Sequence, residues 1–275
     1  MNRNTILMKG MMKFFCFALL LGMASCEKVV DIDLNNSQKK YVIEGIVTDQ
    51  PGLTKVMISQ TKNFDEDNTF VGVSGATVSI RENNTRTIQL TETEPGVYTD
   101  ALFRGLTDRN YTLTVNIGAE TYTAACKMPK RVEMDSIFAT DEFLFTETRK
   151  IMNANYRDPA GRGNSYKFLQ YVNGHKVEQI FIQNDEYTDG RAVNSKLFYF
   201  TDDDDDASNV KSGDEVRIDM LCIDPAVYKY WFSLFRSATG NSGQATPANP
   251  VSNIQGGALG YFSAHTQQTR VITIP

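Results

Sequence analysis

Hydrophobic and polar side chains alternate along much of the chain, with the period of a strand that buries one face. The alternation is clean at 76–81, and β-branched residues are dense at 41–48. Turn residues such as Gly, Pro and Asn separate these segments. In the first half we predict strands at 41–48, 55–59, 76–81, 86–90, 97–98, 111–117 and 121–125. Short strands at regular spacing predict a β-sandwich over 41–130.

The second half, 131–275, keeps the β pattern and changes period once. We predict strands at 167–172, 176–182, 197–200, 215–223 and 270–274, with a hairpin turn at 173–175. Asp224-Pro225 has the form of an N-cap followed by Pro at the first helical position, and apolar residues then recur at helical spacing. The fold class is therefore mainly β, with an N-terminal β-sandwich and a second β-rich domain that carries one helix near 225–237. We expect 239–260, rich in Gly, Ser, Asn and Pro, to be loop.

Composition narrows the class of protein. Hydrophobic residues make up 41% and charged residues 22% of the 275 residues, which argues against a disordered chain or one with many membrane spans. The net charge of −5 argues against general nucleic-acid binding, which relies on clustered Lys and Arg. With only two His residues, few catalytic schemes fit, so we do not expect an enzyme.

The N-terminus has the form of a secretory signal over residues 1–25. Arg3, Lys9 and Lys13 precede an apolar run at 14–23, and this part of the chain contains no acidic residue. A run of about ten residues is too short to cross a bilayer, which takes about twenty.

The signal ends in Met23-Ala24-Ser25-Cys26, which resembles a bacterial lipobox. The resemblance implies cleavage before Cys26 and acylation of its sulfur, which would anchor the chain stably in a membrane. A plain secretory signal with an ordinary Cys26 thiol is the alternative. Residues 26–40 are predicted to be a polar, lipidated tether. The mature chain keeps 28 − 3 = 25 basic residues against 33 acidic ones, a net charge of −8.

Two further cysteines, Cys126 and Cys222, remain after the anchor. Export permits a disulfide between them, but two cysteines do not make a framework. We favour two separate buried thiols and leave the pairing open.

The run of aspartates at 202–206 is the first candidate for a metal site, since calcium prefers oxygen ligands. Asp202, Asp204 and Asp206 are weak candidates only. The helix-loop-helix calcium pattern fails, because Ala207 stands where its Gly should be and Gly213 where its Glu should be. We therefore predict a solvated acidic loop, no metal and no cofactor.

Other catalytic or phosphate-binding motifs are missing from the sequence. His175 and His265 have no metal-binding partner at a suitable spacing, and the chain has no Gly-x-Ser-x-Gly elbow. The Gly-rich stretch at 256–260 lacks the Lys of a phosphate loop. We expect its glycines to let the backbone pass close to an aromatic neighbour.

Two polar, Gly-rich segments are our candidates for contact with a partner or ligand, because polar loops on a rigid sandwich often carry function. They are 158–166 and 249–262. The candidate residues are Asp158, Gly161, Asn164, Tyr166, Asn253, Gly256, Gly257, Tyr261 and Phe262. The helix aromatics should be mostly core, and any that stays exposed would be an interface anchor.

Within the first half, a set of packing motifs resembles the transthyretin-like or carboxypeptidase-regulatory-like sandwich. The motifs are Gly75-Ala76-x-Val78-x-Ile80, Pro95-Gly96-x-Tyr98, Leu106 and Tyr111-x-Leu113-x-Val115. They carry no chemistry.

A second set of landmarks covers nearly the whole mature chain. They are Tyr41-Val42-Ile43-Glu44-Gly45, Asp158-Pro159-x-Gly161, Ser212-Gly213-Asp214-x-Val216, Tyr228-x-Tyr230-Trp231 and the block from Asn249-Pro250 to Gly260-Tyr261-Phe262. This set resembles the Bacteroidota outer-membrane lipoprotein family of domain of unknown function 4249. The family has no assigned catalytic residues. Its members are commonly encoded near TonB-dependent transporters, which implies an accessory role at such a β-barrel.

Our leading hypothesis is a non-enzymatic outer-membrane lipoprotein that assists nutrient uptake by binding a TonB-dependent transporter, a ligand, or both. A structural or adhesive surface lipoprotein is the alternative. A calcium-dependent hydrolase that uses the acidic loops is a remote third. The sequence does not decide which face of the outer membrane carries the protein, nor its ligand or oligomeric state.

Overall fold

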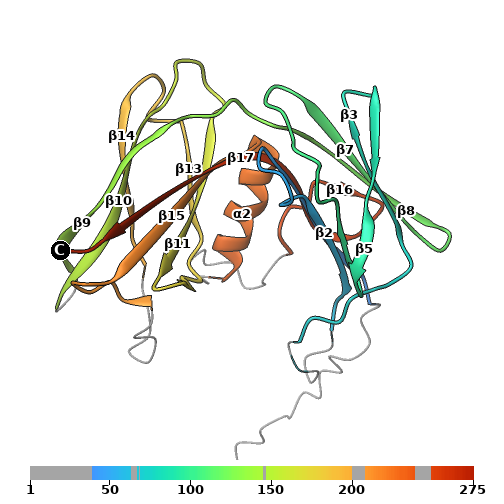
Figure 1. Cartoon of the computed structure of the whole chain (residues 1–275), viewed down its shortest axis with the longest axis horizontal. Helices are drawn as coiled ribbons and strands as arrows, with labels where there is room; N and C mark the ends of the chain where they lie inside the picture. The colour runs from blue at the N-terminus through green and yellow to red at the C-terminus, as the bar shows by residue number, and fades with distance from the viewer. Residues whose placement is uncertain (1–38, 63–66, 68, 145–146, 200–207, 239–248) are drawn as a thin grey trace, which may run out of the picture. The chain divides into compact units, whose positions relative to one another are not determined.

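A computed structural model describes residues 39–62, 67, 69–144, 147–199, 208–238 and 249–275 of the chain. These residues belong to one compact unit that is mainly β with one helix, which confirms the predicted fold class (Figure 1). The predicted signal peptide, Cys26, most of the tether and Asp202, Asp204 and Asp206 lie outside the described residues.

The first half supplies most of a five-stranded sheet. Its order is β16 (Ile254–Gln255), β8 (Glu120–Lys127), β7 (Asn110–Ile117), β3 (Thr77–Glu82) and β4 (Arg86–Gln89). All of its pairs are antiparallel. The short β16 comes from the second half, so this sheet also binds the Gly-rich segment that the sequence predicted to be loop.

The largest sheet has nine strands drawn from both halves. Its path is β12 (His175–Lys176), β11 (Ser165–Val172), β15 (Glu215–Cys222), β17 (Leu259–Thr273), β1 (Tyr41–Thr48), β2 (Lys55–Gln60), β6 (Val97–Thr99) and β5 (Thr91–Glu94), and β13 (Phe181–Asn184) also pairs with β11. The long β17, dark red in Figure 1, pairs with β15 on one side and, in parallel, with β1 on the other.

The third sheet has three strands. Its order is β14 (Ala192–Leu197), β10 (Glu147–Arg157) and β9 (Met134–Leu144), all antiparallel.

Buried apolar side chains form two clusters. The first joins the five-stranded sheet to β1 and β2, and it also takes in Leu221, Val227 and Phe262 from the second half. The second joins the three-stranded sheet to β11 and β15. Strands from both halves therefore build the nine-stranded sheet, and side chains from both halves build the first core.

The predicted strands of the first half fall within a residue or two of their observed positions, although β5 was not predicted. The second half departs from prediction in several places. Strand β14 ends at Leu197, where a strand was predicted to begin. We predicted neither β9 nor β10. The closing strand was predicted to begin at residue 270 and begins at 259. In the predicted hairpin the turn at Asn173-Gly174 is present, but pairing stops after Lys176, and β13 pairs with the other end of β11.

The start of β17 was missed because its buried side chains are polar. Ser263, His265, Thr266 and Gln268 are all buried in the middle of the sheet. Gln268 is satisfied by the Val132 carbonyl and the Met134 N–H, and Ser263 by the His265 ring at 2.8 Å. Gln268 is buried through hydrogen bonds to distant residues, and Ser263 and His265 satisfy each other within the strand, so the hydrophobic pattern does not show this burial.

Cys126 and Cys222 are buried, separate thiols, as the sequence favoured. Burial raises the pKa of both thiols, which keeps them protonated and unreactive. No helix among the described residues has both the length and the apolar character needed to cross a membrane.

Candidate functional site

The first predicted contact segment, 158–166, is held in place by a turn at 185–190. The N–H groups of Gly163 and Asn164 both donate to Oδ2 of Asp185, over 2.7 and 2.8 Å. Asp185 itself is buried. A charged acceptor of two backbone N–H groups gives strong hydrogen bonds, so this loop has a defined conformation.

Asp189, in the same turn, also binds the 158–166 segment. The Gly161 N–H donates to Oδ1 of Asp189 over 2.7 Å. The Asp189 N–H in turn donates to the Asp185 carbonyl over 3.1 Å, and Gly190 follows with a positive φ. This tight turn leaves Tyr187 at its tip with 80% of its surface exposed.

Asp158 lies near these two carboxylates, and none of its surface is exposed. The hydroxyl of Tyr166, also fully buried, donates to its Oδ1, while its Oδ2 is buried without a hydrogen-bond partner. Burial raises the pKa of Asp158, and the negative charges of Asp185 and Asp189 raise it further. The Tyr166 hydrogen bond and the Gly190 N–H act in the opposite direction.

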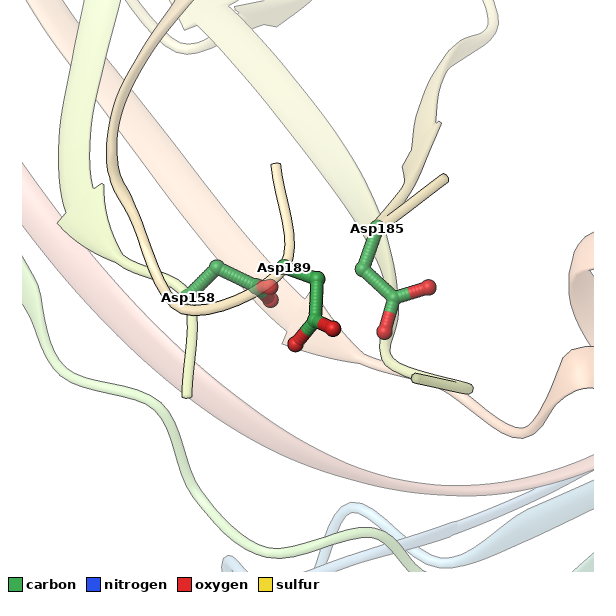
Figure 2. A group of neighbouring side chains, drawn as sticks. All are labelled: Asp158, Asp185 and Asp189. Atoms are coloured by element: carbon green, nitrogen blue, oxygen red, sulfur yellow. The ribbon is translucent and has the colours of Figure 1, made fainter. Parts of the chain in front are cut away.

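Asp158, Asp185 and Asp189, which we call the aspartate trio, each offer one carboxylate oxygen within 4.8 Å of the others. Figure 2 shows the carboxylates of Asp158 and Asp189 close together and one Asp185 oxygen directed toward them. Among the described residues, no Lys or Arg forms an ion pair with any of the three. Oxygen-only ligands suit a hard divalent cation such as calcium.

Helix α2 (Pro225–Ala238) lies next to this turn, in contact with β13, β11 and β17. Asp224 caps it as predicted, since its Oδ1 accepts the Ala226 N–H over 2.8 Å. The other oxygen of Asp224 accepts the Lys127 N–H over 3.2 Å, which ties the helix start to β8. The position of α2 is therefore fixed at its N-terminus.

One side of α2 leaves aromatic surface exposed. Phe232 is 41% exposed and its ring is stacked on that of Tyr228, with centroids 5.9 Å apart. Partial burial raises the pKa of Tyr228, and the negative charge of Glu186 raises it further. Glu186 precedes Tyr187, and β13, the strand that leads into the turn, contacts α2, so the turn lies near this part of the helix.

The second predicted contact segment packs on α2 as well. The Val251 N–H donates to Oγ of Ser233 over 2.8 Å. The Tyr261 ring lies 4.8 Å from that of Tyr230 and 5.1 Å from that of Trp231, centroid to centroid. Val251 itself is 44% exposed. We call Tyr187, Tyr228, Phe232 and Val251 together the α2 face.

Lys167 supports the helix from β11. Its Nζ lies 3.0 Å from the centroid of the Trp231 ring, a cation–π contact. Burial lowers the pKa of Lys167 to about 7, aided by the charge of Lys176 and opposed by Glu44. Close to neutral pH this lysine is therefore only partly charged.

Several predicted contact residues instead have packing positions. Phe262 is fully buried in the first core, and its backbone exchanges hydrogen bonds of 2.8 and 2.9 Å with the Asn253 side chain. Gly256 has a φ of +101°, and a Cβ there would lie 2.8 Å from both the Thr121 carbonyl and the Tyr122 ring. This confirms the expected close approach to an aromatic side chain. Gly257 has a φ of +91°, and a Cβ there would have no neighbour within 4 Å.

The acidic residues of the turn, Asp185 and Asp189, were not predicted as site residues. Asp185-Glu186 and Asp189-Gly190 have the composition of an ordinary solvated turn. Only the tertiary structure brings them to Asp158, which precedes them by 27 and 31 residues (185 − 158 and 189 − 158). Their separation along the sequence therefore did not indicate a common site.

A family model for a domain of unknown function, DUF4249, matches residues 27–271. This chain belongs to the DUF4249 family. The match covers nearly the whole chain, and the aspartate trio and the α2 face both lie within the matched residues. No curated protein matches the sequence.

Proposed function

We propose that this DUF4249 protein is a non-enzymatic outer-membrane lipoprotein that assists nutrient uptake by binding a TonB-dependent transporter through the α2 face. The observation that carries the proposal is the position of α2. Both segments that the sequence marked for contact flank this helix, 158–166 through the turn at 185–190 and 249–262 through direct packing.

The chemistry of the α2 face suits a protein partner. Tyr187 and Phe232 expose large aromatic surfaces on elements that hydrogen bonds hold in place, so little conformational entropy is lost when they are covered. Aromatic residues at the centre of an interface commonly contribute about 2 kcal/mol or more each to binding. Arg236, whose guanidinium lies 5.8 Å from the Phe232 ring centroid, adds a charge at the rim.

The lipobox-like sequence at Cys26 supports the membrane part of the proposal. An acyl anchor would confine the protein to the membrane surface that holds the transporter, which raises the effective concentration of each partner for the other. A modest contact area on the α2 face is then sufficient for a lasting complex.

Affinity purification from the native host tests the proposal. The tagged full-length protein is purified from gently solubilised outer membrane, alongside the double variant Tyr187→Ala/Phe232→Ala. Phe143→Ala is the matched control, since Phe143 is 73% exposed but lies on β9 of the three-stranded sheet.

We expect the unchanged protein and the Phe143→Ala variant to recover a β-barrel transporter. The amount of transporter recovered with the double variant should be at least about tenfold smaller. Recovery of no transporter by the unchanged protein would contradict the proposal. Normal growth of a deletion strain on every nutrient would favour a structural or adhesive role instead.

A further inference from the structure

We propose that the aspartate trio is a calcium site, with Asp158, Asp185 and Asp189 each supplying a carboxylate oxygen. The site joins the 158–164 loop to the turn at 185–190. It goes beyond the transporter-binding proposal and does not depend on it, since metal binding requires no partner.

The three carboxylates are oriented by the protein in the same way. Each has one oxygen that accepts a hydrogen bond: Asp158 from the Tyr166 hydroxyl, Asp185 from Gly163 and Asn164, and Asp189 from Gly161. Among the described residues no donor has hydrogen-bond geometry to Oδ2 of Asp158, although the Gly190 N–H lies close enough to lower the pKa of that carboxyl. Donors that fix a carboxylate through one oxygen and leave the other for the ion are the usual outer shell of a metal ligand.

Asp158 gives an observation that is independent of the acidic clustering. Its side chain is fully buried, and Oδ2 has no hydrogen-bond partner. A buried carboxylate oxygen without a partner is costly, and two more carboxylates beside it add repulsion. A bound cation removes both penalties, and no Lys or Arg within the described ranges supplies that charge by an ion pair.

The geometry and ligand type favour calcium over magnesium. Calcium accepts six to eight oxygens at about 2.3–2.6 Å, so two of its ligand oxygens lie up to about 5 Å apart, which the 4.8 Å limit of the trio satisfies. Magnesium requires near-ideal octahedral geometry at about 2.0–2.1 Å and usually binds through one or two carboxylates. Three carboxylates from two separate segments, 158–164 and the turn at 185–190, suit the larger ion, whose coordination geometry is less strict.

Calcium at this position would order the turn that presents Tyr187, because Tyr187 lies between two of the ligands in sequence. The backbone N–H groups of Gly161 and Gly163, which donate to the same carboxylates, would exchange with solvent more slowly in the loaded protein.

Calorimetric titration of the full-length protein in detergent, freed of metal by a chelator, tests the site. We expect one Ca²⁺ per chain. Asp185→Asn and Asp189→Asn should each weaken binding about tenfold or more, since each loses a charged ligand but keeps an acceptor oxygen for its backbone donors. Circular dichroism confirms that these variants fold; Asp189 is the safer position because it is only partly buried.

Two controls localise the ion. Asp135→Asn removes an exposed charge from β9. The triple variant Asp202→Asn/Asp204→Asn/Asp206→Asn removes charge from the acidic run that the sequence singled out. Both variants should bind Ca²⁺ with the affinity of the unchanged protein. No binding at millimolar Ca²⁺ would overturn the proposal. So would loss of binding in the triple variant alone, or equal affinity for Mg²⁺.

Discussion

The hydroxyl of Tyr166, at the start of β11, donates a hydrogen bond to Oδ1 of Asp158, and both side chains are fully buried. This pair joins the second core to the aspartate trio. The Tyr166 ring packs on that of Tyr156 with centroids 4.7 Å apart, while its hydroxyl orients the deepest carboxylate of the trio.

Replacing Tyr166 with Phe should lower the free energy of unfolding by about 1–3 kcal/mol, because the buried Asp158 would lose its hydrogen-bond donor. Tyr156→Phe is the matched control. The Tyr156 hydroxyl only accepts a 3.5 Å bond from Ser195, so its loss should cost less than about 1 kcal/mol. Urea denaturation measures both. Equal effects of the two variants would show that the Tyr166 hydroxyl has no special role.

Calcium should stabilise the folded protein, because an ion that binds only the native state shifts the folding equilibrium. At a free Ca²⁺ concentration of 100 times Kd the gain is about 2.7 kcal/mol. Thermal denaturation should therefore show a higher Tm with Ca²⁺ than with chelator for the unchanged protein. The Asp189→Asn variant should show a much smaller shift, and an identical shift in both proteins would refute the assignment of the ligand.

Replacing Gly256 and Gly257 one at a time distinguishes the effect of steric crowding on stability from the effect of backbone strain. Gly256→Ala should destabilise the protein about 1–3 kcal/mol more than Gly257→Ala, because only at Gly256 would the new Cβ meet the Thr121 carbonyl and the Tyr122 ring at 2.8 Å. Both positions have positive φ, so the strain of that conformation is common to the two variants. Chemical denaturation of both variants gives the difference directly.

The buried His265 should make the protein less stable in mild acid. Burial, helped by the charge of Lys167, lowers its pKa to about 3 from the ordinary value of 6.5. Between these values the unfolded chain binds the proton and the folded chain does not, so stability present above pH 6.5 is lost as the pH falls toward 3.

From pH 7 to pH 5 this residue alone should remove about 2 kcal/mol of the free energy of unfolding. His265→Gln keeps a polar group near Ser263 and does not titrate, so its stability should fall by about 2 kcal/mol less over the same interval. Parallel urea titrations at the two pH values provide the comparison. Identical pH dependence in both proteins would show that the folded state protonates His265 readily.

The sequence predicted those elements whose buried side chains are apolar. Strand β1 was predicted with its observed bounds, and α2 within one residue of its C-terminus, because hydrophobic period, capping and turn residues agree there. The start of β17 was missed because the residues that it buries, such as His265 and Gln268, are polar; Gln268 is satisfied only by hydrogen bonds to residues far away in the sequence, and His265 by its neighbour Ser263.

Of the residues in the candidate site, the sequence likewise indicated some and missed others. The sequence singled out Asp158 and Tyr261 because their segments are more elaborate than simple turns. It did not connect them with Asp185 or Tyr187, since only the pairing of β11 with β13 and the packing of α2 bring these residues together. Local pattern carries no information on such long-range neighbours.

Cross-linking from the α2 face in living cells of the native host tests the central claim most directly. A photoreactive amino acid replaces Tyr187, and Phe143 carries the same group as the control. The account predicts that mass spectrometry finds the Tyr187 variant joined to a β-barrel transporter, with Cys26 acylated, and the Phe143 variant not joined to it. A protein that is unmodified at Cys26 and free in the culture fluid, or one that forms no transporter adduct from Tyr187, would contradict it.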